Sequence, residues 1–170
     1  IARRLHGDGF RAYTADDLVG VEIGGAAKNV MAIAVGIGDG LSLGANTRAA
    51  IITRGLAEIM RLSEALGARA ETLMGLAGMG DLVLTCTDNQ SRNRRMGLLL
   101  AQNKSVAQAS AEIQQVVEGV GAAPEVLRLA QRLGVEMPIT EAVTRLLAGE
   151  ITPVQAVMAL ATRPRKAEAG

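Results

Sequence analysis

The sequence is nearly devoid of aromatic residues and contains a single cysteine. Its 170 residues include one phenylalanine, one tyrosine and no tryptophan, and Cys86 is the only thiol. Because one thiol cannot form an intramolecular disulfide, we expect a fold held by packing alone, as is usual in a reducing compartment. A core without aromatic rings must be built from Leu, Val, Ile, Ala and Met, a composition that favours packed helices over a β-sandwich.

Neither sign of charge predominates, and histidine and cysteine, the usual zinc ligands, are scarce. Basic and acidic residues number 18 and 17, which leaves a formal net charge of +1. This balance gives no electrostatic footprint for nucleic acid. The only histidine, His6, lies outside the expected helical body, which argues against a zinc site or a Ser–His–Asp triad. We therefore expect no metal and no nucleic-acid partner.

Long hydrophobic runs are missing too. The most apolar run, residues 30–37, is too short to span a bilayer and ends in glycines. The first residues lack the apolar stretch of a signal peptide, which predicts a cytoplasmic protein without a membrane span. The chain opens on Ile1 without a methionine, which suggests a fragment of a longer protein.

Hydrophobic periodicity predicts helices along most of the chain. We expect them at residues 21–36, 47–66, 70–76, 80–85, 92–102, 105–113, 122–133, 140–147 and 153–162. The glycine-rich run 36–46 predicts a loop, and in the helix after it Glu58 and the neighbouring arginines are expected mostly on the polar face. Residues 10–14 resemble one short strand, which cannot be stable alone. The sequence thus predicts an all-α domain with a short N-terminal appendage.

Lys28 lies in an unusually small and apolar setting. On a helix it shares one face with Gly24, Gly25 and Ala32, so a ligand could come close to its ammonium group. Apolar surroundings destabilise an unpaired ammonium, and such a lysine can exchange protons near neutral pH. The alternative is that Lys28 reaches solvent through its flexible stem, as most lysines do.

A second cluster surrounds Asp81, which follows the glycines of GLAGMGD at an expected helix start. An aspartate at this position usually caps the helix or interacts with its dipole. The functional alternative places Asp81 against Lys28, where it fixes the lysine or binds a substrate hydroxyl. Thr85 follows one turn later on the same face.

The third cluster is SRNRR, which starts another expected helix. Ser91, Arg92 and Asn93 supply a hydroxyl, a guanidinium and an amide where backbone N–H groups and the helix dipole favour an anion. Basic residues normally prefer the other end of a helix, so Arg92 is best explained by a phosphate or carboxylate that neutralises it. The alternatives are a solvated basic face and a phosphate contact in a nucleic-acid binder, and the near-neutral charge and the lack of aromatic residues argue against the second.

The chain has no nucleotide-binding fingerprint of its own. The only G-x-G-x-x-[GA] match is Gly7-x-Gly9-x-x-Ala12, and it precedes the expected strand instead of following one. A dinucleotide loop requires the order strand, loop, helix.

Taken together, the three clusters resemble NAD(P)-dependent glycerol-3-phosphate dehydrogenase of the bacterial type. The matching stretches are GVEIGGAAKNVMAIAVGIGDGLSLGANTRAAIITRGLAEI, GLAGMGDLVLTC, SRNRRMG and VVEGV, in the family's order, and the resemblance runs from Phe10 to Arg163. It implies the C-terminal substrate-binding domain, a multi-helix bundle like the C-terminal domain of 6-phosphogluconate dehydrogenase. Residues 1–20 would be a remnant of the N-terminal NAD(P)-binding domain, 21–165 the helical domain and 166–170 a frayed tail.

The resemblance also implies roles for individual residues. Lys28 is similar to the family's catalytic lysine, which takes the C2 hydroxyl proton of sn-glycerol 3-phosphate and returns it to dihydroxyacetone phosphate in the reverse direction. The other matched positions are Asp81, Ser91, Arg92 and Asn93 for substrate, Arg92, Val116 and Glu118 for the cofactor, and Asn29 and Thr85 as supporting contacts. Ala27 and Val117 depart from the usual residues without touching a proposed catalytic side chain.

The implied function is one half of an oxidoreductase. NAD or NADP would be bound mainly by an absent Rossmann domain, without which this chain would be inactive, and the product would feed glycerophospholipid synthesis. A homodimer is expected. Two alternatives stay open: the substrate domain of another 6-phosphogluconate dehydrogenase-like hydroxyacid dehydrogenase, and a non-enzymatic helical dimerisation module in which Lys28 and Arg92 would lie far apart and exposed.

Overall fold

Helices make up most of the protein in the computed structural model, which describes residues 7, 9 and 13–162. They are α2 (Leu18–Gly40), α3 (Gly44–Ala65), α4 (Ala70–Met74), the π-helical turn η1 (Leu76–Gly80), α5 (Asp81–Thr87), α6 (Arg92–Ala101), α7 (Val106–Ile113), α8 (Glu118–Arg132), α9 (Pro138–Leu147) and α10 (Pro153–Ala161). None of residues 13–162 is in a β-strand, so the all-α prediction is confirmed. The strand predicted at 10–14 lies largely outside the described residues, and its last two residues are irregular.

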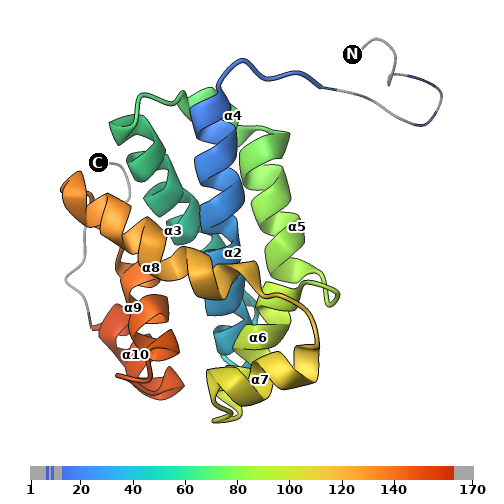
Figure 1. The fold of residues 1–170 in the computed structure, drawn as a ribbon, viewed down its shortest axis with the longest axis vertical. Helices are drawn as coiled ribbons and strands as arrows, with labels where there is room; N and C mark the ends of the chain where they lie inside the picture. Colours follow the sequence, from blue (N-terminus) through green and yellow to red (C-terminus); the bar gives the residue numbers. More distant parts are fainter. Residues whose placement is uncertain (1–6, 8, 10–12, 163–170) are drawn as a thin grey trace.

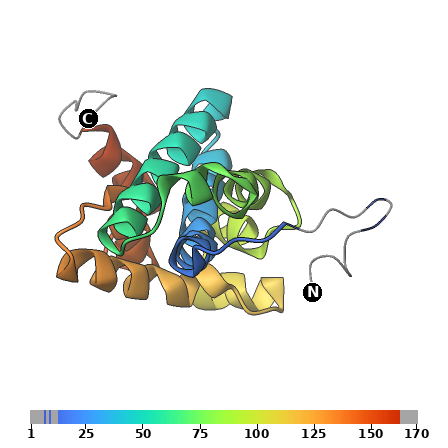
Figure 2. The ribbon, with the colours of Figure 1, turned by 90° about the horizontal axis from the view of Figure 1, so that it is seen from above.

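Helix α2 is the centre of the bundle (Figures 1 and 2). It packs against α3, α5, α6, α8 and α9. Val30, Met31, Ile33 and Val35 have no exposed surface. By length and composition alone α2 could cross a membrane, but 56% of its most apolar window is buried inside the bundle, which is the environment of a core helix.

The loop predicted at 36–46 is wrong, because α2 continues to Gly40 and α3 already begins at Gly44. The glycines of this run serve a close helix crossing. A Cβ atom on Gly36 would lie 2.1 Å from the carbonyl oxygen of Arg94 in α6, and one on Gly40 would lie 2.5 Å from the Cβ of Ala101. Contact with α6 therefore requires glycine inside a helix, although glycine lowers the intrinsic helix propensity.

The prediction that Glu58 lies on the polar face of α3 is also wrong. Its side chain is buried with 1% exposure, and its carboxylate accepts the N–H groups of Ile139 and Thr140 at 2.6 and 3.2 Å. These are the first N–H groups of α9, whose own N-cap residue, Met137, makes no side-chain capping bond. Glu58 thus caps a distant helix start. Burial raises the pKa of this carboxyl to about 7, against the hydrogen bonds that lower it.

Helix α8 begins at Glu118, four residues before the predicted start at residue 122, and it contains Pro124. The earlier start brings the first turn of α8 beside α2 and α6, where Asn93 accepts a hydrogen bond from Gly119. The starts of α5, α6 and α8 all lie near the middle of α2, because Asp81 pairs with Lys28, Asn93 donates to Asn29, and Gly119 donates to Asn93.

Candidate functional site

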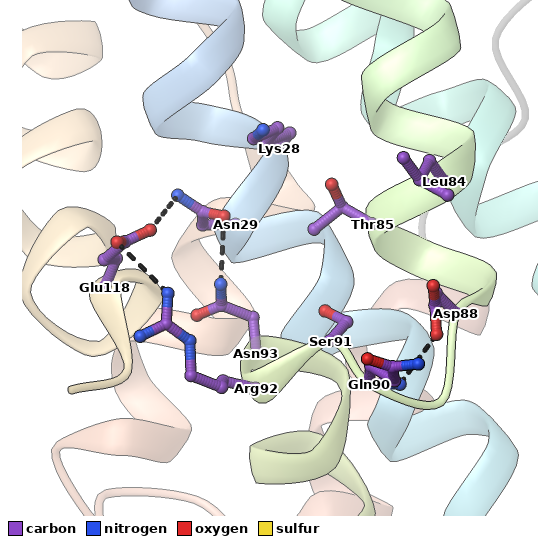
Figure 3. Close-up of a pocket in the computed structure, with 10 residues that line it drawn as sticks. All are labelled: Lys28, Asn29, Leu84, Thr85, Asp88, Gln90, Ser91, Arg92, Asn93 and Glu118. Atoms are coloured by element: carbon purple, nitrogen blue, oxygen red, sulfur yellow. Dashed lines mark hydrogen bonds and ion pairs between the residues drawn. The ribbon is translucent and has the colours of Figure 1, made fainter. Parts of the chain in front are cut away.

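A pocket of about 280 Å³ lies between α2, α5, α6 and α8 (Figure 3). Its walls come from the middle of α2, the second half of α5, the loop between α5 and α6, and the starts of α6 and α8. The lining residues are Lys28, Asn29, Leu84, Thr85, Asp88, Gln90, Ser91, Arg92, Asn93 and Glu118. The fold thus brings together most of the residues singled out from the sequence, although they range from Lys28 to Glu118 along the chain.

Lys28 projects from α2 into this pocket, and its Nζ forms an ion pair with Oδ2 of Asp81. The Lys28 side chain is 21% exposed and that of Asp81 is 36% exposed, so solvent or a small molecule can reach both. Thr85 supports the pair, since its hydroxyl donates to the carbonyl oxygen of Asp81 at 2.7 Å and lies 3.4 Å from Oδ1. Lys28 is therefore neither an isolated ammonium nor a freely solvated one.

The small-residue face around Lys28 is only partly open. Gly24 is buried against Leu73 and Ala32 has no exposed surface, so neither faces a ligand. At Gly25, by contrast, no atom lies within 4 Å of the position that a Cβ would occupy. Of these small residues, only Gly25 has open space beside it.

A π-helical turn places Asp81 opposite Lys28. In η1 the backbone of Gly78 presses against the preceding helix, and a Cβ there would lie 2.1 Å from the carbonyl oxygen of Leu73. Helix α5 then starts at Asp81. π-Helical segments are rare and recur at functional sites. The helix start was predicted from the sequence, but the π-turn carried no periodic signal of its own.

The start of α6 supplies hydrogen-bond donors to the pocket. Ser91 is the N-cap, and its Oγ accepts the N–H of Arg94 at 3.3 Å. The N–H groups of Arg92 and Asn93, the first two of the helix, have no acceptor within it. The Arg92 guanidinium lines the pocket, 39% of its side chain is exposed, and it reaches Glu118 at 3.5 Å. Donors and a cation thus point to one place that suits an anion.

The side chain of Asn93 is engaged by the protein itself. Its Nδ2 donates to Oδ1 of Asn29 at 2.9 Å, and its Oδ1 accepts the N–H of Gly119 at 2.8 Å. Asn29 in turn donates to Glu118 at 3.4 Å (Figure 3). Asn93 is only 5% exposed, and both ends of its side-chain amide are bonded within the protein. The sequence predicts that this amide contacts substrate, whereas in the folded chain it bonds to Asn29 and Gly119.

Of the three residues predicted to contact the cofactor, Arg92 lines the pocket, and the other two differ in position. Glu118 lies at the rim of the pocket with 56% of its side chain exposed, next to Arg92. Val116 is 76% exposed and does not line the pocket. Within residues 13–162 no group of three or more His, Cys, Asp or Glu side chains could hold a metal ion.

Comparison with known proteins identifies the domain. The family model of the NAD-dependent glycerol-3-phosphate dehydrogenase C-terminus matches residues 17–158. The chain belongs to this family. A glycerol-3-phosphate dehydrogenase [NAD(P)+] of Dechloromonas aromatica is 62% identical over 98% of the chain and 51% of its own length. The chain spans about half the length of the curated relatives that it matches.

Solved structures of family members have the same fold. The crystal structure of glycerol-3-phosphate dehydrogenase from Coxiella burnetii is similar with a TM-score of 0.92 and 53% identity, over 95% of this chain and 50% of that one. The enzyme from Saccharomyces cerevisiae is similar with a TM-score of 0.83 and 29% identity, over 91% and 46%. The predicted resemblance is confirmed, and the curated relatives carry NAD(P) in their names, the cofactor expected from the sequence.

Proposed function

We propose that this chain is the substrate-binding and catalytic half of an enzyme that interconverts sn-glycerol 3-phosphate and dihydroxyacetone phosphate with NAD(P). The observation that carries the proposal is the shared pocket, which is lined both by Lys28, the partner of Asp81, and by the start of α6 with Arg92. A dimerisation module would leave Lys28 and Arg92 far apart, and both line this pocket. The anion donors favour a phosphorylated substrate over an unphosphorylated hydroxyacid.

The proton chemistry is assigned to Lys28. Its neutral amine takes the proton of the C2 hydroxyl while hydride leaves C2, and its ammonium returns a proton to the carbonyl in the reverse direction. Nicotinamide, when bound, supplies the hydride acceptor. Asp81 holds the Lys28 side chain in place through the ion pair, and Thr85 holds Asp81. The lysine is thus positioned before the substrate arrives.

The phosphate end of the substrate is assigned to the start of α6. There the N–H groups of Arg92 and Asn93 and the Arg92 guanidinium would bind the phosphate oxygens. Binding energy from this remote group orients the reacting carbon at Lys28. Arg92 and Glu118, with Val116 beside them, would meet the cofactor from this side.

The domain organisation of the complete enzyme is assigned from the family resemblance and the length of the relatives. We assign residues 1–20 to the end of a preceding NAD(P)-binding domain, 21–165 to the substrate domain and 166–170 to a tail. The relatives are about twice as long as this chain, and this supports an additional cofactor-binding half. The complete enzyme would be a cytoplasmic homodimer that feeds glycerophospholipid synthesis, and the 170-residue chain alone would be inactive.

Two measurements test the proposal. In the first, the ¹⁵N-labelled chain is titrated with glycerol 3-phosphate, and we expect the amide resonances of Arg92 and Asn93 to shift. Arg92→Ala should remove the shift, while Arg128→Ala, at an exposed ion pair in α8, should not. Unmoved resonances at the start of α6 would contradict the anion site.

The second measurement is catalytic. The chain is joined to the N-terminal half of the 62% identical relative, and turnover of glycerol 3-phosphate with NAD(P) is followed. We expect Lys28→Ala to lower kcat by about a thousand-fold, because general acid–base catalysis contributes 10²–10⁴. Since the ion pair is partly exposed, the melting temperature should change little. Wild-type turnover in Lys28→Ala would exclude its catalytic role.

A further inference from the structure

The SRNRR motif contains a second arginine that the proposed function leaves unassigned. Arg94 is 8% exposed, in contrast to Arg92. Its Nε and one terminal nitrogen donate to Oδ2 of Asp39 at 3.2 and 2.7 Å, and the other terminal nitrogen donates to Oδ1 of Asn89 at 2.6 Å. Arg48 contacts the same carboxylate at 2.9 Å. Arg94 therefore joins the end of α2, the start of α6 and the loop between α5 and α6.

Arg94 and Asp39 both occupy helix ends that disfavour their charges. Arg94 lies in the first turn of α6, where the helix dipole repels a cation, and Asp39 lies in the last turn of α2, where it repels an anion. Each charge neutralises the other in a site with little solvent. The planar guanidinium has enough donors to bind a second acceptor at the same time, and that acceptor is Asn89.

The backbone of Arg94 is fixed as well. Its N–H donates to the Ser91 side chain at 3.3 Å. Its carbonyl oxygen lies so close to Gly36 that a Cβ there would be 2.1 Å away. The first turn of α6 is thus locked to α2, the helix that carries Lys28.

Asn89 connects Arg94 to the wall of the pocket. It is exposed and lies in the short connection from α5 to α6, where its neighbours Asp88, Gln90 and Ser91 line the pocket. Asp88 accepts the N–H of Gln90 at 2.7 Å, which makes the connection a tight turn. The hydrogen bond from Arg94 ties this turn to the α2–α6 crossing.

We propose that Arg94 is a positioning residue for the substrate's phosphate. Anchored by Asp39, it holds Asn89 and thereby keeps the turn and the N–H groups of Arg92 and Asn93 in the arrangement that receives the anion. The inference rests on the proposed function, because it assumes that glycerol 3-phosphate binds at the start of α6.

The obvious variant, Arg94→Ala, leaves Asp39 buried with half of its partners and can fail to fold. Two milder variants remove the Arg94–Asn89 bond and leave a cation beside Asp39. Asn89→Ala deletes an exposed side chain, and Arg94→Lys keeps the charge beside Asp39 but lacks the planar fork that reaches both acceptors. In NMR titrations of the 170-residue chain with glycerol 3-phosphate, each should weaken binding about five-fold, the size of one hydrogen bond.

The double variant Asn89→Ala/Arg94→Lys is the decisive measurement. Because both changes break the same bond, its affinity should equal that of either single variant. Before any ligand is added, the amide resonances of residues 89–92 should shift in both single variants while those of α9 stay in place. Thermal unfolding should remain cooperative, and Arg145→Lys, at the exposed pair with Glu150, should bind as the wild type does.

The outcomes separate the two claims. Wild-type affinity in Asn89→Ala and Arg94→Lys, or losses that add in the double variant, would overturn the positioning role while the proposed function stands. If the unaltered chain shows no binding at the start of α6, both are overturned.

Discussion

The Nδ2 group of Asn93 donates a 2.9 Å hydrogen bond to Oδ1 of Asn29, a residue 64 positions earlier in the chain. Oδ1 of the same Asn93 amide accepts a hydrogen bond from the N–H of Gly119. Through this one side chain α2, α6 and α8 meet at a buried point beside Lys28 and Glu118. The pocket is therefore built on a polar junction inside the bundle, and a polar group buried there is costly when it loses its partner.

Asn93→Ala should destabilise the protein by about 2 kcal/mol. The substitution leaves the Gly119 N–H and the side-chain Oδ1 of Asn29 without this partner in a buried place, and an unsatisfied buried group costs about 1–3 kcal/mol. The measurement is urea unfolding followed by circular dichroism. The control is Asn46→Ala on the exposed surface of α3, for which we expect a change within about 0.5 kcal/mol. Equal losses in the two variants would contradict the role of the junction.

Replacing two glycines of α8 by alanine should change the stability of the protein in opposite directions. A Cβ on Gly119 would lie 2.8 Å from Oδ1 of Asn93 and from the backbone oxygen of Asn29, so Gly119→Ala should cost about 1–3 kcal/mol through overpacking. At Gly121 no atom lies within 4 Å, and Gly121→Ala should stabilise α8 by about 0.5–1 kcal/mol.

Thermal melts of the two glycine variants, compared with the wild type, give the check. A rise in the melting temperature of Gly119→Ala would show that the first turn of α8 does not pack against α2 as closely as described. The same variant should also weaken glycerol 3-phosphate binding, since it displaces Asn93.

Glu58 should make stability depend on pH in an unusual sense. Burial raises its folded pKa to about 7, from a usual value of 4.5. Between these values the folded chain keeps a proton that the unfolded chain has released, so this carboxyl's contribution to the free energy of unfolding falls as pH rises from 4.5 to 7. The fall should approach about 3 kcal/mol and level off above pH 7.

The test compares the wild type with Glu58→Gln, which cannot titrate. Unfolding free energies are measured in urea at pH 5 and pH 8, and the wild type should lose more stability than the variant over this interval. A difference between the two proteins that is the same at both values would show that Glu58 is ionised throughout.

Cys86 should be unreactive in the folded protein. The thiol is buried with no exposed surface, and burial raises its pKa to about 12, so almost no thiolate forms at pH 8. A disulfide reagent such as dithionitrobenzoate should label it only after unfolding by guanidinium, which serves as the positive control. Complete labelling of the native chain within seconds would contradict the burial.

Much of the fold could be predicted because the apolar periodicity of the amphipathic helices reports directly on burial. The loop expected around Gly36 shows where this reasoning fails. Glycine is a local signal for a turn, but at Gly36 and Gly40 the reason for glycine is the backbone of α6, about 60 residues away. The prediction that Glu58 lies on the polar face is wrong for a related reason, since the helix start that Glu58 caps belongs to a distant part of the chain.

The sequence predicts which residues belong to the site better than it predicts which partners they contact. Charge in an apolar helix singled out Lys28, and a cation at a helix start singled out Arg92; both line the pocket. No local pattern distinguishes Arg92 from Arg94, yet one lines the pocket and the other is held by Asp39. The roles of Asn93 and Arg94 depend on partners that only the folded chain supplies. The catalytic and binding roles themselves stay predictions.

The central place of α2 has a consequence for how activity is lost on heating. Amide protons at residues 30–37 lie where every neighbouring helix must separate before water enters, so they should exchange with solvent only through global unfolding, whereas α10 at the periphery can open locally. Lys28 lies on the same helix, just before this slowest segment. Fraying of the outer helices leaves the lysine in register with Asp81, and inactivation should coincide with one cooperative transition of the whole domain.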